Sequence, residues 1–402
     1  LRRLPGAGPG VEAPVPGRVV AAPRMRLVAE PLKDSFGPEV IERIAADIAA
    51  VHPAFPRSEF VRRASDGFGD LELTPRARLI SAALAATLPA DRGEALRVLG
   101  ASLGPPLGDR ESGGMAAFVY LPHVYFVADH GLDHFEEAMW FQHEVTRRFT
   151  AEYSIRTFLD AHTQRTLAQL REWASDPDMH VRRLVSEGTR PRLPWAPRLQ
   201  RFIDDPSPVV DLLELLKDDR AEYVRRSVAN NLNDISKDHP DLAVEVARRW
   251  LRRPERARLV RHGMRTLVKL GHRGALEVLG YADRDGIEVE ELAVVPRRVR
   301  IGDRTRLRAV VANRATSARS ALVDFRVHFV KRNGSSPKVF KGKEARIEAG
   351  GRLEVAKTVS LARQTTRTPY PGTHRVELVV NGKVSAATTF EVDEPLPDSG
   401  PT

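Results

Sequence analysis

Cysteine is absent from this sequence of 402 residues. Its absence excludes disulfides, thiolate metal sites and cysteine nucleophiles, and it fits the cytoplasmic location that we expect. No run of apolar residues approaches the roughly 18 needed to cross a bilayer, so we expect no membrane association. Phosphate-binding loops, dinucleotide-binding fingerprints and nucleophile elbows are also missing. The chain must therefore act through other residue types.

Charge is distributed unevenly along the chain. Lys and Arg number 63 against 53 Asp and Glu, which gives a formal net charge of +10. Residues 181–270 contain 20 basic and 13 acidic residues, so this stretch carries most of the excess. A basic surface concentrated in one region indicates a polyanionic partner, most simply nucleic acid. The alternative is an ordinary solvated charged surface, and charge alone does not decide between the two.

Helical periodicity begins after a leader rich in proline, glycine and arginine. Residues 1–27 show no apolar pattern, so we expect them to be disordered, and Met25 is a candidate start residue in place of Leu1. After Pro38, apolar residues recur at helical spacing. We predict an all-helical domain over 28–285. Its early helices are expected at 40–48, 75–88, 92–103, 115–127, 135–149 and 154–173.

Internal similarity indicates how the later helices are arranged. The run HVRR at 180–183 and the run YVRR at 223–226 lie 43 residues apart, and each follows an acidic turn. A weaker echo, LVRH, follows 36 residues later at 259–262. Periods near 40 residues are typical of HEAT-like arrays, in which helix pairs stack into a curved solenoid. The second helix of each pair lines the concave surface, so the arginines of these runs should recur on one side.

The apolar period changes from helical to alternating at Gly286. The run VDFRVHF at 323–329 alternates strictly, as a half-buried strand requires, and Asn-Gly or Gly-Gly pairs supply turns. About seven short strands over 286–393 predict an immunoglobulin-like β-sandwich, and 394–402 is a predicted disordered tail. The predicted fold class is multidomain, α plus β: an all-α HEAT-like repeat solenoid followed by an all-β immunoglobulin-like sandwich.

The stretch MHVRRLVSEGTRPRLPW at 179–195 places several chemically useful side chains at the end of one predicted helix. Gly188 is expected to end the helix, and Pro191 and Pro194 keep regular structure from resuming. Trp195 would then lie on a short rigid connector. Glu187 would lie in the last helical turn, near that connector.

Two further carboxylates and several histidines are candidates for chemistry. Glu152 lies at a helix boundary 35 residues before Glu187, so the two could face one concave site, although helix-end ion pairs are the more common role for such residues. Asp234 lies at a helix C-terminal end, where a carboxylate is unfavourable against the helix dipole unless a function or a local bond compensates. His130 and His134 lack an evident third ligand, and HExxH fails because Arg147 occupies the second histidine position. We therefore expect no metal and no cofactor.

These residues resemble a known family. The sequence EPLKD at 30–34, RFTAE at 148–152 and above all HVRRLVSEGTRPRLPW at 180–195 is similar to the AlkC-type DNA alkylation repair glycosylases of the HEAT-like AlkC and AlkD superfamily. The resemblance covers about 30–281, and one branch of the family carries a C-terminal immunoglobulin-like domain. It implies a monofunctional glycosylase, acting as a monomer on double-stranded DNA, that removes cationic N-methylated bases such as 3-methyladenine and 3-methylcytosine without full base flipping.

The resemblance also implies site residues. Glu152, Glu187 and Trp195 would lie at the active site, and Asp234 and Arg183 match the family less decisively. The sandwich domain is expected to contact DNA and help enclose the duplex. The residues expected to bind the DNA backbone are Arg156, Arg182, Arg183, Arg190, Arg192, Arg225, Arg226 and Lys237.

Physical chemistry agrees with this assignment. A base methylated on a ring nitrogen already carries a positive charge, so it leaves without a general acid. The enzyme must stabilise an oxocarbenium-like sugar and position water, and carboxylates suit both tasks. A tryptophan adds a cation–π contact of roughly 0.5 to 2 kcal/mol. The alternative function is a non-catalytic HEAT-like scaffold that binds nucleic acid or an acidic protein through the same arginines and does not need the carboxylates.

Overall fold

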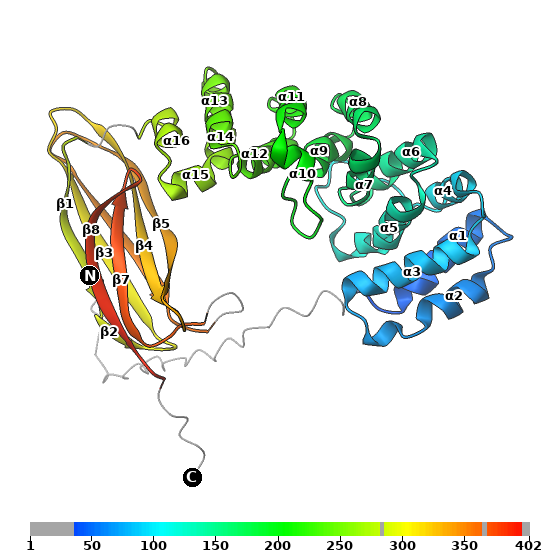
Figure 1. The fold of residues 1–402 in the computed structure, drawn as a ribbon, viewed down its shortest axis with the longest axis horizontal. Coiled ribbons are helices and arrows are strands. Elements are labelled where there is room, and N and C mark those ends of the chain that lie inside the picture. The colour runs from blue at the N-terminus through cyan, green and yellow to red at the C-terminus, as the bar shows by residue number, and fades with distance from the viewer. Residues whose placement is uncertain (1–35, 282–284, 364–367, 396–402) are drawn as a thin grey trace, which may run out of the picture.

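The computed structural model describes residues 36–281, 285–363 and 368–395, with helices in the N-terminal part of the chain and two β-sheets in the C-terminal part (Figure 1). The predicted leader, 1–27, and most of the predicted tail lie outside the described residues. The helices are α1 (Glu39–Val51), α2 (Arg57–Ser65), η2 (Phe68–Asp70), α3 (Leu73–Thr87), α4 (Arg92–Ala101), η3 (Gly114–Tyr120), α5 (Leu121–His130), α6 (Phe135–Thr146), α7 (Ser154–Ala161), α8 (Thr163–Trp173), α9 (Met179–Gly188), α10 (Gln200–Asp204), α11 (Ser207–Leu216), α12 (Glu222–Ile235), α13 (Pro240–Trp250), η4 (Pro254–Arg256), α14 (Ala257–Gly263), α15 (Arg265–Leu270) and α16 (Arg273–Val278).

Two of the early helices differ from their predicted extents, and one helix was not predicted. The predicted single helix at 154–173 is two helices, because His162, between α7 and α8, has a non-helical backbone conformation. The Thr163 hydroxyl donates a hydrogen bond to the carbonyl of Leu159 at this break. The predicted helix at 115–127 is a 3-10 segment, η3, followed by α5, with Pro122 in the first turn of α5. The short helix α2 was missed in the sequence because only Phe60 and Ala64 of its nine residues are buried, which leaves a weak apolar pattern.

The later helices form the predicted repeat array. Helix α8 packs against α9, α11 against α12 and α13 against α14, and the second helices of these pairs also pack on one another in the order α9, α12, α14. One continuous apolar core runs through the array from Phe36 to Ala275. Figure 1 shows that the helices follow an arc, as expected for stacked repeats. The HEAT-like solenoid is confirmed.

The C-terminal part is a sandwich of two sheets, as predicted, with eight strands in the described residues where about seven were expected from the turn spacing. The three-stranded sheet has the order β1-β3-β6, the five-stranded sheet has the order β2-β8-β7-β4-β5, and one apolar core lies between them. The predicted Asn381-Gly382 turn joins β7 and β8, with both residues at positive φ. The strands are β1 (Ile287–Val295), β2 (Arg298–Arg300), β3 (Arg304–Asn313), β4 (Arg319–Val330), β5 (Ser335–Ile347), β6 (Arg352–Ser360), β7 (Gly372–Val380) and β8 (Lys383–Asp393).

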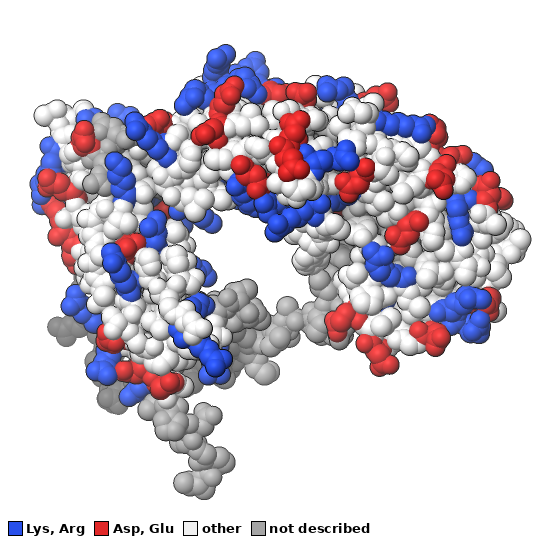
Figure 2. Space-filling view, in the orientation of Figure 1, with Lys and Arg blue, Asp and Glu red and all other residues white. Residues whose placement is uncertain are grey.

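Close packing joins the sandwich to the end of the helical array. A Cβ atom on Gly271, at the end of α15, would lie 2.6 Å from the carbonyl oxygen of Gly382 in the β7–β8 turn. Arg261 of α14 also forms an ion pair with Glu344 of β5. The array and the sandwich border a wide opening, and Lys and Arg side chains gather on its rim beneath the middle of the array (Figure 2). The concave side is therefore the basic side.

Candidate active site

The site is built around α9 and the connector that follows it. The Asp178 side chain caps the helix by accepting a hydrogen bond from the backbone NH of His180 at 2.8 Å. The helix ends at Gly188, as predicted. A side chain at Gly188 would not fit, because its Cβ would lie 2.5 Å from Cγ2 of Ile155 on α7. The end of α9 is therefore packed directly against the preceding repeat.

Arg156 of α7 holds both ends of the connector. Its Nη1 donates hydrogen bonds to the carbonyls of Gly188 at 3.1 Å and Arg190 at 2.7 Å, and its Nε and Nη2 both donate to the carbonyl of Pro197. The side chain is buried, and burial lowers the pKa of Arg156 to about 10. This position corrects the sequence-based role of Arg156, because its guanidinium is enclosed by protein carbonyls and does not face a DNA phosphate.

Trp195 projects from this connector into solvent. Its side chain is 85% exposed, and its φ of 65° lies in the left-handed region that non-glycine residues rarely adopt. Conformations of this kind cost about 1 to 3 kcal/mol and cluster at functional sites. In Figure 1 the connector is the loop that hangs from the array, beside α10, into the opening. The ring is thus presented to whatever enters the opening.

We expect Arg156→Met to loosen the connector. The substitution removes the donor of three carbonyls, and leaving the two buried ones, of Gly188 and Arg190, without a partner costs about 1 to 3 kcal/mol each. Hydrogen exchange of the Arg190 and Leu199 amides, which bond to carbonyls within this segment, should therefore quicken by roughly tenfold or more. Arg165→Met, which removes an exposed arginine on α8, is the control. Unchanged exchange at 188–199 in the Arg156 variant would contradict this role.

The three predicted carboxylates lie in one chain of alternating charges. Arg183 Nη1 lies 2.8 Å from Glu152 Oε2, and Arg183 Nη2 lies 3.5 Å from Glu187 Oε1. Arg190 then bridges Glu187 Oε1, at 2.6 Å, and Asp234 Oδ2, at 2.8 Å. The chain thus connects a turn before α7, the C-terminal half of α9 and the end of α12. The sequence predicted Glu152 and Glu187 at one site and Asp234 as a less decisive member, and in the fold all three lie in this chain of charges.

Burial differs sharply along this chain. The side chain of Glu152 is 26% exposed, while those of Glu187 and Asp234 are 8% and 2% exposed. The second oxygen of Glu187 accepts a 2.6 Å hydrogen bond from Ser227, and that of Asp234 accepts one from Lys237 at 2.8 Å. Glu152 is therefore the carboxylate that an incoming substrate reaches most directly.

The electrostatic environment keeps Glu187 ionised. Burial acts to raise its pKa, but the charges of Arg183 and Arg190 and the Ser227 hydrogen bond outweigh burial and hold the pKa below its ordinary value. Glu187 is thus a carboxylate at neutral pH and cannot serve as a proton donor. Burial acts to lower the pKa of Arg183, but the charges of Glu152 and Glu187 outweigh burial and hold this pKa well above its ordinary range.

The structure also separates the arginines that the sequence grouped as phosphate ligands. The side chain of Arg182 is only 6% exposed and forms a two-point ion pair with Asp219, which corrects its predicted DNA-binding role. Arg190 is occupied by the two buried carboxylates described above.

The other predicted phosphate ligands near the site are more exposed. Arg192 is paired with Asp238 but partly exposed, and Arg226 is paired with Glu111 and about half exposed. Arg183 and Lys237 retain partial exposure beside the carboxylates.

Two residues of this site were missed in the sequence. Tyr223 lies under the Arg183 guanidinium, 5.4 Å from ring centroid to Cζ, and Ser227 binds Glu187. Ser227 occupies the position that corresponds, 43 residues on, to the buried apolar Leu184. A buried hydroxyl in place of leucine was the signal that a polar partner lay opposite it.

Within 36–281, 285–363 and 368–395, no group of three or more His, Asp or Glu side chains is placed to hold a metal ion. No helix in that part of the chain is both long and apolar enough to span a bilayer.

Comparisons with known proteins agree with this arrangement. Residues 144–262 match a family described as DNA alkylation repair enzyme, and residues 288–394 match the C-terminal Ig-like domain of protein YhaZ. The uncharacterized protein YhaZ of Bacillus subtilis (strain 168) is 33% identical over 365 residues, covering 90% of this chain and 99% of the relative. The Pseudomonas fluorescens alkylpurine DNA glycosylase AlkC, solved with DNA containing an abasic site analogue, is 35% identical with a TM-score of 0.83, covering 90% of this chain and 99% of AlkC. This chain therefore belongs to the AlkC-like DNA alkylation repair enzymes that carry a C-terminal immunoglobulin-like domain.

Proposed function

We propose that this protein is a monofunctional DNA glycosylase that removes cationic N-alkylated bases, such as 3-methyladenine and 3-methylcytosine, from duplex DNA. It hydrolyses the N-glycosidic bond without turning the base fully out of the helix. The observation that carries this proposal is the chain of three carboxylates held by arginines at the concave, basic side of the array. The likeness to AlkC supports it.

The carboxylates match the charge that develops in this reaction. The departing base is already cationic, so no proton has to be delivered to it, and an ionised Glu187 is consistent with that. The sugar gains positive charge as the bond breaks, and a fixed negative charge in a water-poor site stabilises it by several kcal/mol, on the order of oxyanion-hole effects with the sign reversed. Glu152, the most exposed carboxylate, contacts the sugar and the attacking water.

Glu187 and Asp234 act mainly by placing the arginines. Each of these carboxylates has both oxygens engaged, and together they fix Arg183 and Arg190 behind Glu152. Trp195 faces the cationic base from the connector, where a cation–π contact contributes roughly 0.5 to 2 kcal/mol. The partly exposed Arg183, Arg192 and Lys237, beside the carboxylates, contact backbone phosphates without reading sequence.

A release assay tests this function. Purified protein is incubated with methylated duplex DNA, and free bases are separated from the polymer and identified. We expect 3-methyladenine or 3-methylcytosine in the released fraction and matching abasic sites in the DNA. Folded protein that binds this DNA but releases no base above a protein-free control would support the scaffold alternative and sink the glycosylase proposal.

A further inference from the structure

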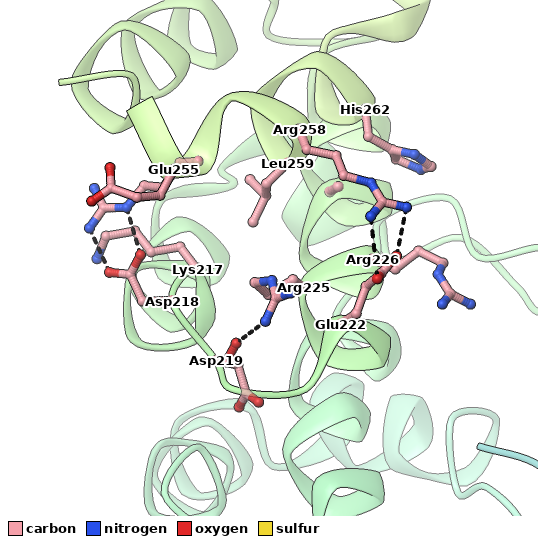
Figure 3. Close-up of a pocket in the computed structure, with 12 residues that line it drawn as sticks. Lys217, Asp218, Asp219, Glu222, Arg225, Arg226, Glu255, Arg258, Leu259 and His262 are labelled. Atoms are coloured by element: carbon pink, nitrogen blue, oxygen red, sulfur yellow. Dashed lines mark hydrogen bonds and ion pairs between the residues drawn. The ribbon is translucent and has the colours of Figure 1, made fainter. Parts of the chain in front are cut away.

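A second basic site lies one repeat beyond the carboxylates. A cavity of about 560 Å³ opens between α12 and the η4–α14 segment (Figure 3). Tyr223 and Ser227 of α12 face the carboxylate chain, while Arg225 and Arg226 of the same helix line this cavity. The two sites therefore share one helix but are separate.

Internal repetition shows what is unusual about Arg225. Arg182 Nη1 donates hydrogen bonds to the carbonyls of Asp176 and Pro177. Arg225 Nη1 donates to the carbonyls of Asp219 and Arg220. The donor and both acceptors of the second set lie 43 residues after those of the first. The two guanidinium groups are thus held in the same way. Each is oriented by the turn that precedes its own helix.

Their remaining donors differ. Arg182 Nε and Nη2 bind the carboxylate of Asp219, which belongs to the next repeat. For Arg225 the corresponding acidic position, 36 residues after Asp219, is Glu255. Glu255 is exposed and points away from Arg225 in Figure 3. Across the described residues, no carboxylate pairs with Arg225, and its Nε and Nη2 have no hydrogen-bond partner.

The other cations of the cavity already have carboxylate partners. Arg256 binds Asp218 through two nitrogens, and Arg258 lies 2.8 Å from Glu222. Arg226 is paired with Glu111, 3.4 Å away. Arg225 therefore has a fixed orientation and open donors, whereas its neighbours are neutralised. A pre-oriented fork with two free N–H groups fits the oxygens of a phosphate.

We propose that this cavity binds a phosphate of the DNA backbone. Arg225 Nε and Nη2 donate hydrogen bonds to the phosphate oxygens, just as the same two nitrogens of Arg182 donate to the carboxylate of Asp219. This inference rests on the proposed function only in taking DNA as the partner.

The test is the salt dependence of binding to undamaged duplex DNA. Arg225→Gln should weaken binding roughly fivefold to tenfold and lower the slope of log affinity against log salt by about 0.9, the value for one phosphate contact. Arg225→Lys keeps the charge, so it should retain the slope while losing part of the affinity. Arg43→Gln, which removes an exposed arginine on α1 that pairs with Asp47, is the matched control for net charge.

The outcomes are distinguishable from failure of the proposed function. If Arg225→Gln has the same affinity and slope as Arg43→Gln while the wild type binds DNA, the phosphate site is refuted. A wild type that binds DNA but releases no base would instead refute the glycosylase proposal and leave this one standing. Thermal unfolding of Arg225→Gln and Arg225→Lys shows whether either variant has lost its fold and not only its contact with DNA. A folded Arg225→Lys with the same salt slope as Arg225→Gln would also contradict the assignment.

Discussion

Glu152→Gln is expected to lower the rate of base release by roughly 100-fold to 1,000-fold, the scale measured when one preorganised charge-stabilising group is removed from an active site. The amide keeps the size of the carboxylate but loses the negative charge that faces the sugar. Affinity for DNA should stay the same or increase, because a negative charge is removed from a surface that receives a polyanion. A single-turnover release assay and a separate binding measurement give the two quantities.

Glu214→Gln is the matched control. Glu214 also pairs with basic side chains and its side chain is 29% exposed, close to the 26% of Glu152, but it lies on α11 outside the carboxylate chain. We expect this variant to release base at nearly the wild-type rate. Equal rates for Glu152→Gln and Glu214→Gln would contradict a catalytic role for Glu152.

Asp219→Asn is expected to destabilise the protein by about 3 kcal/mol or more. It leaves the buried guanidinium of Arg182 without a carboxylate, and breaking one partner of a buried pair costs about 3 to 5 kcal/mol. The asparagine oxygen still caps the Ala221 amide, so the loss is largely that of the charge pair. Denaturant unfolding measures this loss in the free energy of unfolding. The control is the double variant that carries both Arg182→Met and Asp219→Asn.

The double variant distinguishes structure from DNA binding. With both charges gone, no unpaired charge remains buried, so the double variant should recover much of the stability lost by Asp219→Asn. If Arg182→Met were instead neutral for stability and lowered the salt slope of DNA binding by about one contact, Arg182 would be a phosphate ligand, as its sequence context first suggested.

The comparison of Arg182 with Arg225 shows how far sequence could be taken. The 43-residue repeat correctly placed both arginines on equivalent helices. Whether each is free depends on the next repeat, which supplies Asp219 to one and no carboxylate to the other. Spacing within one repeat carries no information on that partner. The sequence therefore predicted the scaffold better than the role of each basic side chain.

The active-site residues show the same limit. Gly188 and the prolines predicted the end of α9 and the connector, because helix stops are local. The Arg156 contacts with three carbonyls of that connector join residues 32 to 41 positions apart, and the bridge from Glu187 through Arg190 to Asp234 spans two repeats. Only tertiary packing sets such distances.

The most direct test of this account compares two duplexes that differ only in the charge of one alkylated base. Single-turnover release is measured with wild-type protein on a duplex with one cationic 3-methyladenine and on the same duplex with a neutral alkylated base. Because Glu187 is ionised and a cationic base needs no proton to leave, we predict rapid release of the cationic base and none of the neutral base above the protein-free rate. Equal release of both bases, or of neither, would contradict the central claim.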